Sequence, residues 1–285
     1  MTILMHIKTF HYLSKFLIYL ILILFAIPMI LPLIWMLITS ITPENIFYSQ
    51  ENLLFIPSEI RINNYYDALS ILPFHKFFIN TLIYSMSATF GSLLSCTVVA
   101  YGFARYEFSK RNLLFWILLC TMILPGIVFM VPMFLMFNYV GWIDTYYPLI
   151  IPTFFGLSAG TVLLLRQRIK TIPNIFFDVS KIEGFNFYQK LRYIILPEIY
   201  PILTTVGVLH FIGHWNDLMG PLIYINTFEK KTLTLGLTYF QSQFTTQITL
   251  MMAASLVVSI PTMIVFYLNQ KKIIRGINLL GGFGR

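Results

Sequence analysis

The sequence predicts an all-α polytopic membrane protein with six transmembrane helices, and three observations carry this prediction. Hydrophobic residues make up 58% of the 285 residues and charged residues make up 11%, against about 25% charged residues in an ordinary soluble domain. The mean hydropathy is +0.78. The hydrophobic residues also gather in long uncharged runs. A soluble globular domain could not cover its surface with so few charges, so that class is excluded.

Each uncharged run is long enough to cross a bilayer as one helix. A helix rises ~1.5 Å per residue, so about 20 residues cross the ~30 Å hydrocarbon layer. Lipid cannot satisfy bare backbone N–H and C=O groups, so each span must be helical. The runs are 16–43, 77–104, 112–143, 145–165, 199–216 and 232–270, the last apolar over about 248–268. We therefore expect one spanning helix in each run.

The first run has a competing interpretation as a secretory signal peptide, with Lys8 and Lys15 as its basic region. Its apolar part, residues 16–38, exceeds the about 7–15 residues of a signal-peptide core. No small-x-small cleavage pattern follows it. We expect an uncleaved transmembrane helix that Pro28 and Pro32 bend.

The distribution of Lys and Arg predicts the orientation of the chain. If the N-terminus is inside, 15 of the 19 Lys and Arg residues lie in inside segments. The positive-inside rule then places both termini in the cytoplasm. These charges are scattered over four inside segments and are not gathered on one face, so the net charge of +8 does not indicate a nucleic-acid partner.

The runs and their connections predict three parts. Residues 1–75 form an N-terminal transmembrane helix and an external segment, 76–270 a five-helix transmembrane core, and 271–285 a cytoplasmic tail. The core includes a long cytoplasmic connection, residues 166–197. A second external segment is expected at about 226–247.

The cytoplasmic connection has the pattern of two short amphipathic helices. Pro173 suits the first turn of a helix, where its missing N–H costs nothing. Ile175, Val179 and Ile182 recur at helical spacing. Gly184 follows at a left-handed C-cap position.

The second of these helices begins at Asn186, which can form a capping box with Gln189. It places Phe187, Leu191, Ile194 and Ile195 on one side, and we expect it to end at Pro197. Two interpretations stay open on physical grounds. The helices either lie on the lipid interface, or an apolar face docks into a groove of a cytoplasmic partner.

The same connection resembles the coupling motif of ABC-importer permeases, which runs as a proline, an acidic-Ala-Ala triplet, Ile-Asp-Gly-Ala and a closing Leu-Pro. The triplet is degenerate here, because Asp stands for Glu and Val-Ser for Ala-Ala, and Glu183 replaces the Asp that follows Ile. The resemblance assigns ATPase coupling to the residues at matching positions, which are Pro173, Asp178, Val179, Ser180, Lys181, Ile182, Glu183, Gly184, Leu196 and Pro197.

Further stretches resemble the sugar-importer branch of that family, the maltose and multiple-sugar type of inner-membrane component. They are AYGFARYEFSKRNLLFW (100–116), HWNDLMGPLIY (214–224), TLTLGL (232–237) and the Arg275-Gly276 pair of the tail. The similarity covers about residues 76–280 in order.

The resemblance implies a type I ABC importer permease fold, with cytoplasmic coupling helices, in a prokaryotic cell membrane. Such a chain pairs with a second homologous permease subunit as a heterodimer. Two copies of a cytoplasmic ABC ATPase drive it, and an extracellular or periplasmic sugar-binding protein delivers the carbohydrate. ATP and Mg²⁺ then bind to the ATPase, and this chain itself binds no cofactor.

The residues themselves also indicate that a separate protein hydrolyses ATP for this chain. The sequence has no G-x-x-x-x-G-K-[ST] motif and no Gly-Lys pair, so it has no P-loop to hold ATP phosphates. Paired carboxylates for acid–base work are missing from the predicted spans. We therefore expect no catalytic residue and no enzyme activity in this chain.

Three alternatives remain. An ion-coupled secondary transporter would need ionisable residues deep in the spans, and this sequence has almost none. A membrane scaffold without transport activity is the second alternative. The third keeps the same importer class but changes the substrate to glycerol phosphate or a related polyol.

The end of the fifth span carries the candidates for the transport pathway. An ionisable residue at membrane depth marks a functional site by default, and the resemblance makes Asp217 part of a signature. We therefore expect pathway or gating roles for Trp215, Asn216 and Asp217. His210 and His214 share a helix face, but Phe211 stands where a zinc motif has Glu, so no metal site is expected.

Overall fold

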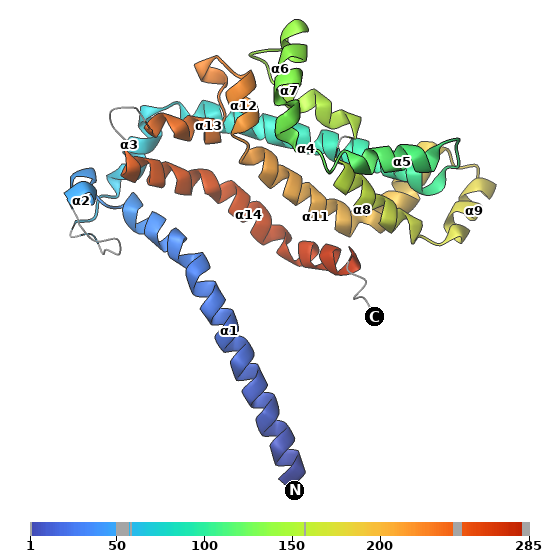
Figure 1. The fold of residues 1–285 in the computed structure, drawn as a ribbon, viewed down its shortest axis with the longest axis horizontal. Coiled ribbons are helices and arrows are strands. Elements are labelled where there is room, and N and C mark those ends of the chain that lie inside the picture. Colours follow the sequence, from blue (N-terminus) through green and yellow to red (C-terminus); the bar gives the residue numbers. More distant parts are fainter. Residues whose placement is uncertain (1, 50–56, 58, 157, 242–246, 281–285) are drawn as a thin grey trace. The chain divides into compact units, whose positions relative to one another are not determined.

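The structure is a computed structural model that describes residues 2–49, 57, 59–156, 158–241 and 247–280. Every regular element in these ranges is a helix, which confirms the all-α fold class (Figure 1). The chain divides into two compact units. The first consists of Met1–Leu72 and Tyr239–Val258, and the second of Pro73–Thr238 and Ser259–Arg285. Parts of the two expected external segments, 50–56, 58 and 242–246, lie outside the described residues.

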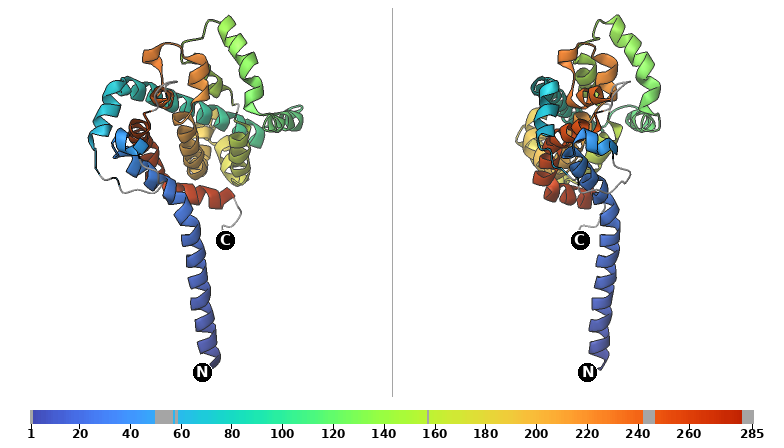
Figure 2. Two further views of the ribbon diagram at one scale, coloured as in Figure 1. Left: turned by 60° about the vertical axis from the view of Figure 1, so that its left-hand side comes forward. Right: turned by 90° about the vertical axis from the view of Figure 1, so that its left-hand side faces the viewer.

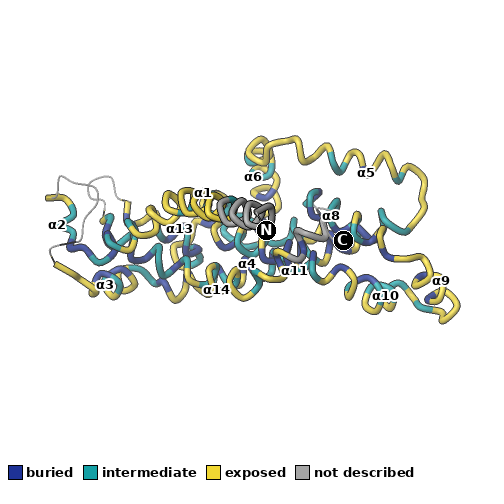
Figure 3. Tube along the Cα trace, turned by 90° about the horizontal axis from the view of Figure 1, so that it is seen from below, coloured by how far each residue is buried: buried dark blue, intermediate teal, exposed yellow. Residues whose placement is uncertain are grey.

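The first unit is built on one long apolar helix. Its elements are α1 (Thr2–Ser40), α2 (Glu44–Ser49), α3 (Asn63–Ile71) and the start of α14 (Ile248–Leu280). α1 continues through Pro28 and Pro32. The apolar window of α1 has no buried residue, and Figure 3 colours most of the described residues of this helix as exposed. An apolar helix without a polar face requires lipid or another chain around it.

Two polar contacts close the first unit at the end of α1. The buried Asn64 side chain donates to Ser40 O at 3.0 Å and Thr42 O at 2.9 Å, so it satisfies carbonyls that the helix end leaves free. The Glu44 carboxylate accepts from the backbone N–H groups of Ile248 and Thr249, both at 3.2 Å, and from the Thr249 hydroxyl. Glu44 thus places a negative charge at the N-terminus of α14.

The second unit is organised around α4 (Phe74–Arg105), which packs against α8 (Ala159–Lys170) and α11 (Leu196–Trp215) (Figures 1 and 2). Its core is apolar and includes the fully buried Val162, Leu165 and Ile199. Small residues of α4, such as Ala88 and Gly91, let the neighbouring elements approach closely.

Shorter elements surround this core. They are α5 (Arg111–Cys120), η1 (Gly126–Phe129), α6 (Met130–Tyr139), α7 (Tyr147–Ile150), η2 (Ile151–Phe155), α9 (Asn174–Ile182), α10 (Phe187–Lys190), the π-helical η3 (Leu191–Ile195), α12 (Met219–Tyr224), η4 (Phe228–Lys230), α13 (Leu233–Leu237) and, at the boundary of the units, η5 (Thr238–Phe240). Figure 1 shows α9 near one end of α4 and α13 near the other.

The described residues give five helices that are long and apolar enough to cross a membrane: Ser14–Ser40, Phe74–Arg105, Tyr147–Lys170, Phe187–Trp215 and Ile248–Ile274. The expectation of a single span over 112–143 is wrong, and the six-helix count is not confirmed. This run divides into α5, η1 and α6. Pro125 is extended, with φ −63° and ψ 132°, and has no N–H to continue α5, so the helix ends before it.

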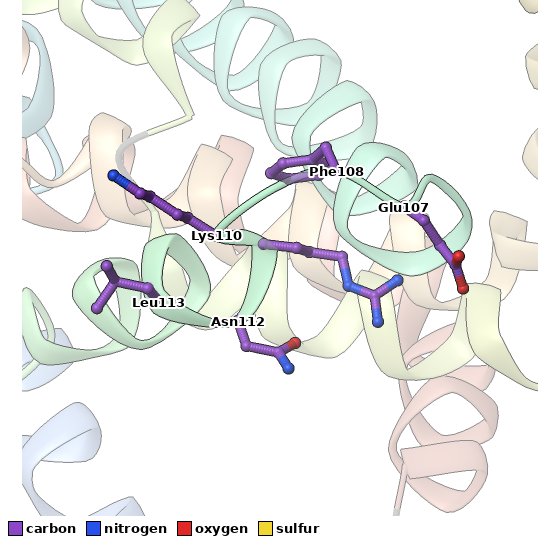
Figure 4. A pocket seen from close by; sticks show the side chains of 6 residues that line it. Glu107, Phe108, Lys110, Asn112 and Leu113 are labelled. Carbon is purple, nitrogen blue, oxygen red and sulfur yellow. The ribbon is translucent and has the colours of Figure 1, made fainter.

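The turn between α4 and α5 surrounds a hollow of about 260 Å³. Its lining residues are Glu107, Phe108, Lys110, Arg111, Asn112 and Leu113 (Figure 4). Lys110 has a left-handed backbone with φ 64°, which turns the chain into α5. Glu107 and Lys110 point away from each other in Figure 4. Because its lining carries both signs of charge, we assign this hollow no ligand.

Candidate functional site

The connection predicted to be an amphipathic hairpin folds as two helices joined at a glycine. α9 starts at Asn174. Pro173, which was expected in the first turn of this helix, is instead the N-cap residue that precedes it. Gly184 has φ 69°, the left-handed conformation that the sequence predicted. The Gly184 N–H donates to Lys181 O at 3.1 Å and the Phe185 N–H to Ser180 O at 2.8 Å. These two bonds form a Schellman motif, which satisfies carbonyls at the end of α9.

α9 presents its apolar residues on the side away from the core. Ile175, Val179 and Ile182 are 63%, 48% and 86% exposed, whereas Phe177 is 9% exposed and Ser180 is 2% exposed. The Ser180 hydroxyl donates to Phe177 O at 2.7 Å, so the residue at an Ala position of the resembled coupling motif is satisfied by its own helix. Exposed apolar side chains of this kind mark a surface that another molecule covers.

The charged coupling candidates on α9 lie at its surface. The side chains of Asp178 and Lys181 are 59% and 70% exposed and form an ion pair of 3.4 Å. An exposed pair of this kind contributes little to stability. Glu183 is exposed and follows α9 as its C-cap. All three are therefore accessible to a partner.

The second helix begins with the predicted capping box. The Gln189 N–H donates to Asn186 Oδ1 at 2.9 Å, and the Asn186 N–H donates to Gln189 Oε1 at 2.7 Å. Ile195 is fully buried, and Phe187, Leu191 and Ile194 pack against the same core, which confirms the expected apolar side.

The prediction that this helix ends at Pro197 is wrong. α10, η3 and α11 follow one another without a break, so Leu196 and Pro197 lie in the first turn of α11. The wider π turn of η3 directly precedes them. A π turn changes the hydrogen-bond register, which accommodates a proline that has no N–H to donate. The hairpin is therefore continuous with a spanning helix.

A mostly apolar groove of about 370 Å³ lies between α9 and η3. It is lined by Ile175, Phe176, Val179, Ser180, Glu183, Phe185, Tyr193 and Ile194. Val179, Ser180 and Glu183 are coupling candidates from the sequence. The structure thus places three of them at one apolar surface.

The pathway candidates lie at the other end of α11, and each has a different environment. Trp215 is fully buried. The Asn216 side chain donates to Ile212 O at 3.0 Å. Asp217 accepts from the Gly220 N–H at 3.1 Å and from the Tyr84 hydroxyl at 2.7 Å. Asp217 is therefore held by α4 and by the first turn of α12.

A file of polar side chains extends from Asp217 between α4, α8 and α11. The Tyr84 hydroxyl lies 3.4 Å from His214 Nδ1. The rings of His214 and His210 stack with centroids 6.0 Å apart. His210 Nε2 lies 2.9 Å from the Thr161 hydroxyl. Among the described residues, no three or more His, Cys, Asp or Glu side chains lie together in a way that could hold a metal ion. Sequence reasoning missed Tyr84, since an uncharged tyrosine in an apolar run gives no signal.

Residues 156–160 fit the nucleophile-elbow pattern G-x-S-x-G, which sequence analysis overlooked. That motif requires a strand before the serine, whereas η2 precedes Ser158 here. The Ser158 hydroxyl donates to the Thr161 hydroxyl at 2.9 Å. The pattern therefore does not make Ser158 a nucleophile.

Asp144 forms a second cluster that sequence reasoning missed. Its carboxylate accepts from the N–H groups of Asn226 and Thr227 at 3.0 and 2.8 Å, from the Thr227 hydroxyl at 2.5 Å and from Lys230 Nζ at 2.9 Å. The bonds from Thr227, followed by those from Lys230 and Asn226, hold the pKa of Asp144 well below its ordinary range. Asp144 is the single charged residue between Arg111 and Arg166, which is the signal that could have found it.

The fold and these sites define a class: a polytopic all-α membrane protein with an amphipathic hairpin and a polar file within the second unit. Residues 91–278 match the family of binding-protein-dependent transport system inner membrane components, and the chain belongs to this family. This confirms the resemblance to ABC-importer permeases that the motifs indicated.

Relatives at modest identity are permeases of sugar transport systems. The chain is 25% identical over 199 residues to the lactose transport system permease protein LacG of Rhizobium radiobacter, covering 70% of this chain and 72% of LacG. It is 27% identical over 254 residues to the arabinooligosaccharides transport system permease protein AraQ of Bacillus subtilis, covering 88% and 89%.

Its fold is similar to a chain of a bacterial ABC transporter that imports the acidic polysaccharide alginate. The TM-score is 0.79 at 23% identity, with 91% of this chain and 96% of that chain covered. A chain of the alginate transporter in complex with its pentasaccharide-bound periplasmic protein gives a TM-score of 0.63 at 15% identity, over the same shares. These similarities support the permease fold.

Proposed function

We propose that this chain is one of two permease subunits of an ATP-driven importer for a carbohydrate. Its membership of the binding-protein-dependent family and its sugar-permease relatives support this proposal. An external binding protein delivers the sugar, and two copies of a cytoplasmic ATPase supply the energy. The second permease subunit completes the pathway as a heterodimer. Both termini lie in the cytoplasm, in agreement with the Lys and Arg distribution.

The observation that supports docking of an ATPase on this chain is the exposed apolar face of α9. Ile182 is 86% exposed and lies at the end of a helix whose opposite side is buried in the core. A helix in this position can insert its apolar residues into a cleft of the ATPase. The coupling candidates Pro173, Asp178, Val179, Ser180, Lys181, Ile182, Glu183 and Gly184 then form the docking element, and Leu196 and Pro197 join it to α11.

In this mechanism, closure of the ATPase dimer displaces α9, and the displacement passes to the spans. Differential binding of the two states by the ATPase supplies the free energy for the transition. The pathway candidates Trp215, Asn216 and Asp217 would respond at the far end of α11. This chain holds no nucleotide and performs no catalysis in the mechanism.

The test is purification of the complex followed by uptake into vesicles. Radiolabelled lactose, arabinotriose, diacetylchitobiose, maltotriose and glycerol 3-phosphate form the substrate panel, so polyol phosphate import is a distinct outcome. We expect an ATPase to co-purify and one sugar to enter only when ATP is supplied. Proton-driven uptake by the lone chain, without ATP, would show a secondary transporter instead.

A variant separates docking from folding. Ile182→Asp places a charge on the exposed face of α9 and should release the ATPase. The matched control is Ile60→Asp, at a residue that is 66% exposed in the first unit. Equal retention of the ATPase by both variants would contradict the docking role of α9.

A further inference from the structure

Arg105, the last residue of α4, joins this span to the coupling helix. Its Nη1 donates to Asn174 Oδ1 at 2.7 Å, at the first residue of α9. Its Nη2 donates to Ile169 O at 2.7 Å in the last turn of α8, and to Ile172 O in the link between α8 and α9. The guanidinium carbon lies 4.1 Å from the ring centroid of Phe177, a buried aromatic residue of α9. One side chain therefore contacts the end of α8, the link and α9.

The chemistry of these contacts requires arginine. The last carbonyls of a helix have no partner within it, and the end of the helix carries a partial negative charge. A planar guanidinium can donate to several acceptors in one plane while its face packs on an aromatic ring. A lysine ammonium at the same position keeps the charge but not this geometry.

α4 also contacts the second helix of the hairpin, one turn before Arg105. Tyr101 is 2% exposed, and its ring stacks on that of Phe187 in α10 with centroids 5.2 Å apart and planes 29° apart. Arg166 of α8 also bonds to α4, because its Nε donates a hydrogen bond to Phe103 O at 3.2 Å. The last turn of α4 is thus tied to α8, α9 and α10.

α4 extends from these contacts to the polar file. Arg105 lies 21 positions after Tyr84 on the same helix, a distance of about 30 Å along the helix axis. Tyr84 holds Asp217, one of the pathway candidates. A displacement of the last turn of α4 therefore reaches the Tyr84–Asp217 contact if the helix moves as a rigid element.

We propose that Arg105 is a positioning residue that makes α4 move together with the coupling helix, so that ATPase closure reaches the pathway through α4. This inference rests on the proposed function, since it assigns the path by which that function is driven. It predicts uncoupling, in which ATP is hydrolysed but sugar transport per ATP falls.

The experiment compares variants of the whole transporter in vesicles, with the panel sugar that the wild-type complex takes up as the probe. In Arg105→Lys, we expect normal co-purification of the ATPase and ATP hydrolysis within about twofold of wild type, but about fivefold less uptake per ATP. Asn174→Ala removes one acceptor and should lower the ratio about twofold. The control is Arg192→Lys, at an exposed arginine of the same connection, which should leave the ratio unchanged.

A wild-type ratio of uptake to ATP in Arg105→Lys would overturn the inference. An equal fall of uptake and hydrolysis would also overturn it, because a merely structural role lowers both together. If Arg105→Lys does not assemble, Asn174→Ala decides, and an unchanged ratio in that variant overturns the inference. Wild-type uptake that does not depend on ATP would contradict the proposed function itself, and the inference would fall with it.

Discussion

The Tyr84 hydroxyl donates a 2.7 Å hydrogen bond to Asp217 Oδ2, which joins α4 to the turn between α11 and α12. This arrangement also requires glycine at position 220, because a Cβ added there would lie 2.5 Å from the same Asp217 oxygen. The contact fixes the Asp217 carboxylate at the end of the polar file.

Tyr84→Phe tests this contact. The change removes the hydroxyl but keeps the ring, so Asp217 loses one charge-assisted donor at a cost of about 1–2 kcal/mol. We expect a lower melting temperature of the purified complex in detergent. Tyr66→Phe is the control, since Tyr66 is 76% exposed. Identical melting of both variants would show that the Tyr84–Asp217 bond does not contribute to stability.

Position 184 is expected to tolerate other residues according to how readily each adopts the left-handed backbone conformation. Nothing lies within 4 Å of an added Cβ, so only backbone conformation opposes substitution. Gly184→Ala should destabilise the hairpin by about 1 kcal/mol and Gly184→Asn by less. Gly184→Leu should uncouple ATP hydrolysis from uptake.

The control for Gly184 is Gly102→Ala. Gly102 lies inside α4 and also has nothing within 4 Å of an added Cβ. Alanine favours a helix interior by about 1 kcal/mol over glycine, so this variant should be neutral or stabilising. The measurements are proteolysis of the hairpin and uptake per ATP. Normal uptake per ATP in Gly184→Leu would contradict the role of the turn.

Gly276 should resist enlargement. An added Cβ would collide with the Thr205 hydroxyl and lie 3.1 Å from Pro201 O. Gly276→Ala is therefore expected to destabilise the packing of α14 on α11 by about 1–3 kcal/mol, measured by thermal unfolding. Thr205→Ala in the same chain should restore part of the loss. No restoration would locate the strain elsewhere.

The hydrogen bonds to the Asp144 carboxylate should make the stability of the folded chain depend on pH. Its pKa is lowered in the folded chain, so its contribution is present above the ordinary aspartate pKa of about 4 and is lost as the pH falls below that value. Asp144→Asn keeps a residue that tolerates the φ of 62° but removes the charge. It should cost about 2 kcal/mol at pH 7. The difference between the two chains should vanish in acid, and a pH-independent difference would contradict this assignment.

The hairpin could be predicted because its signals are local. Gly184 needs a left-handed backbone, and Asn186 and Gln189 cap each other across three residues. The contacts of Tyr84, Arg105 and Asp144 could not be predicted in this way, because their partners lie more than sixty residues away in sequence.

The errors concerned proline. Pro125 divides the run 112–143, although the run is uncharged throughout. Pro197 does not end its helix, because the π turn of η3 precedes it. Hydropathy reports which residues can lie in lipid, whereas the hydrogen-bond register decides where a helix breaks.

The most direct test of the central claim places a photo-crosslinking residue at position 182 in cells that accumulate the transported sugar. The exposed end of α9 should capture an ATPase, recognised by its binding of labelled ATP. The same crosslinker at position 66 should not capture it. Crosslinks from position 182 that contain lipid and no ATP-binding protein, during active uptake, would contradict the account.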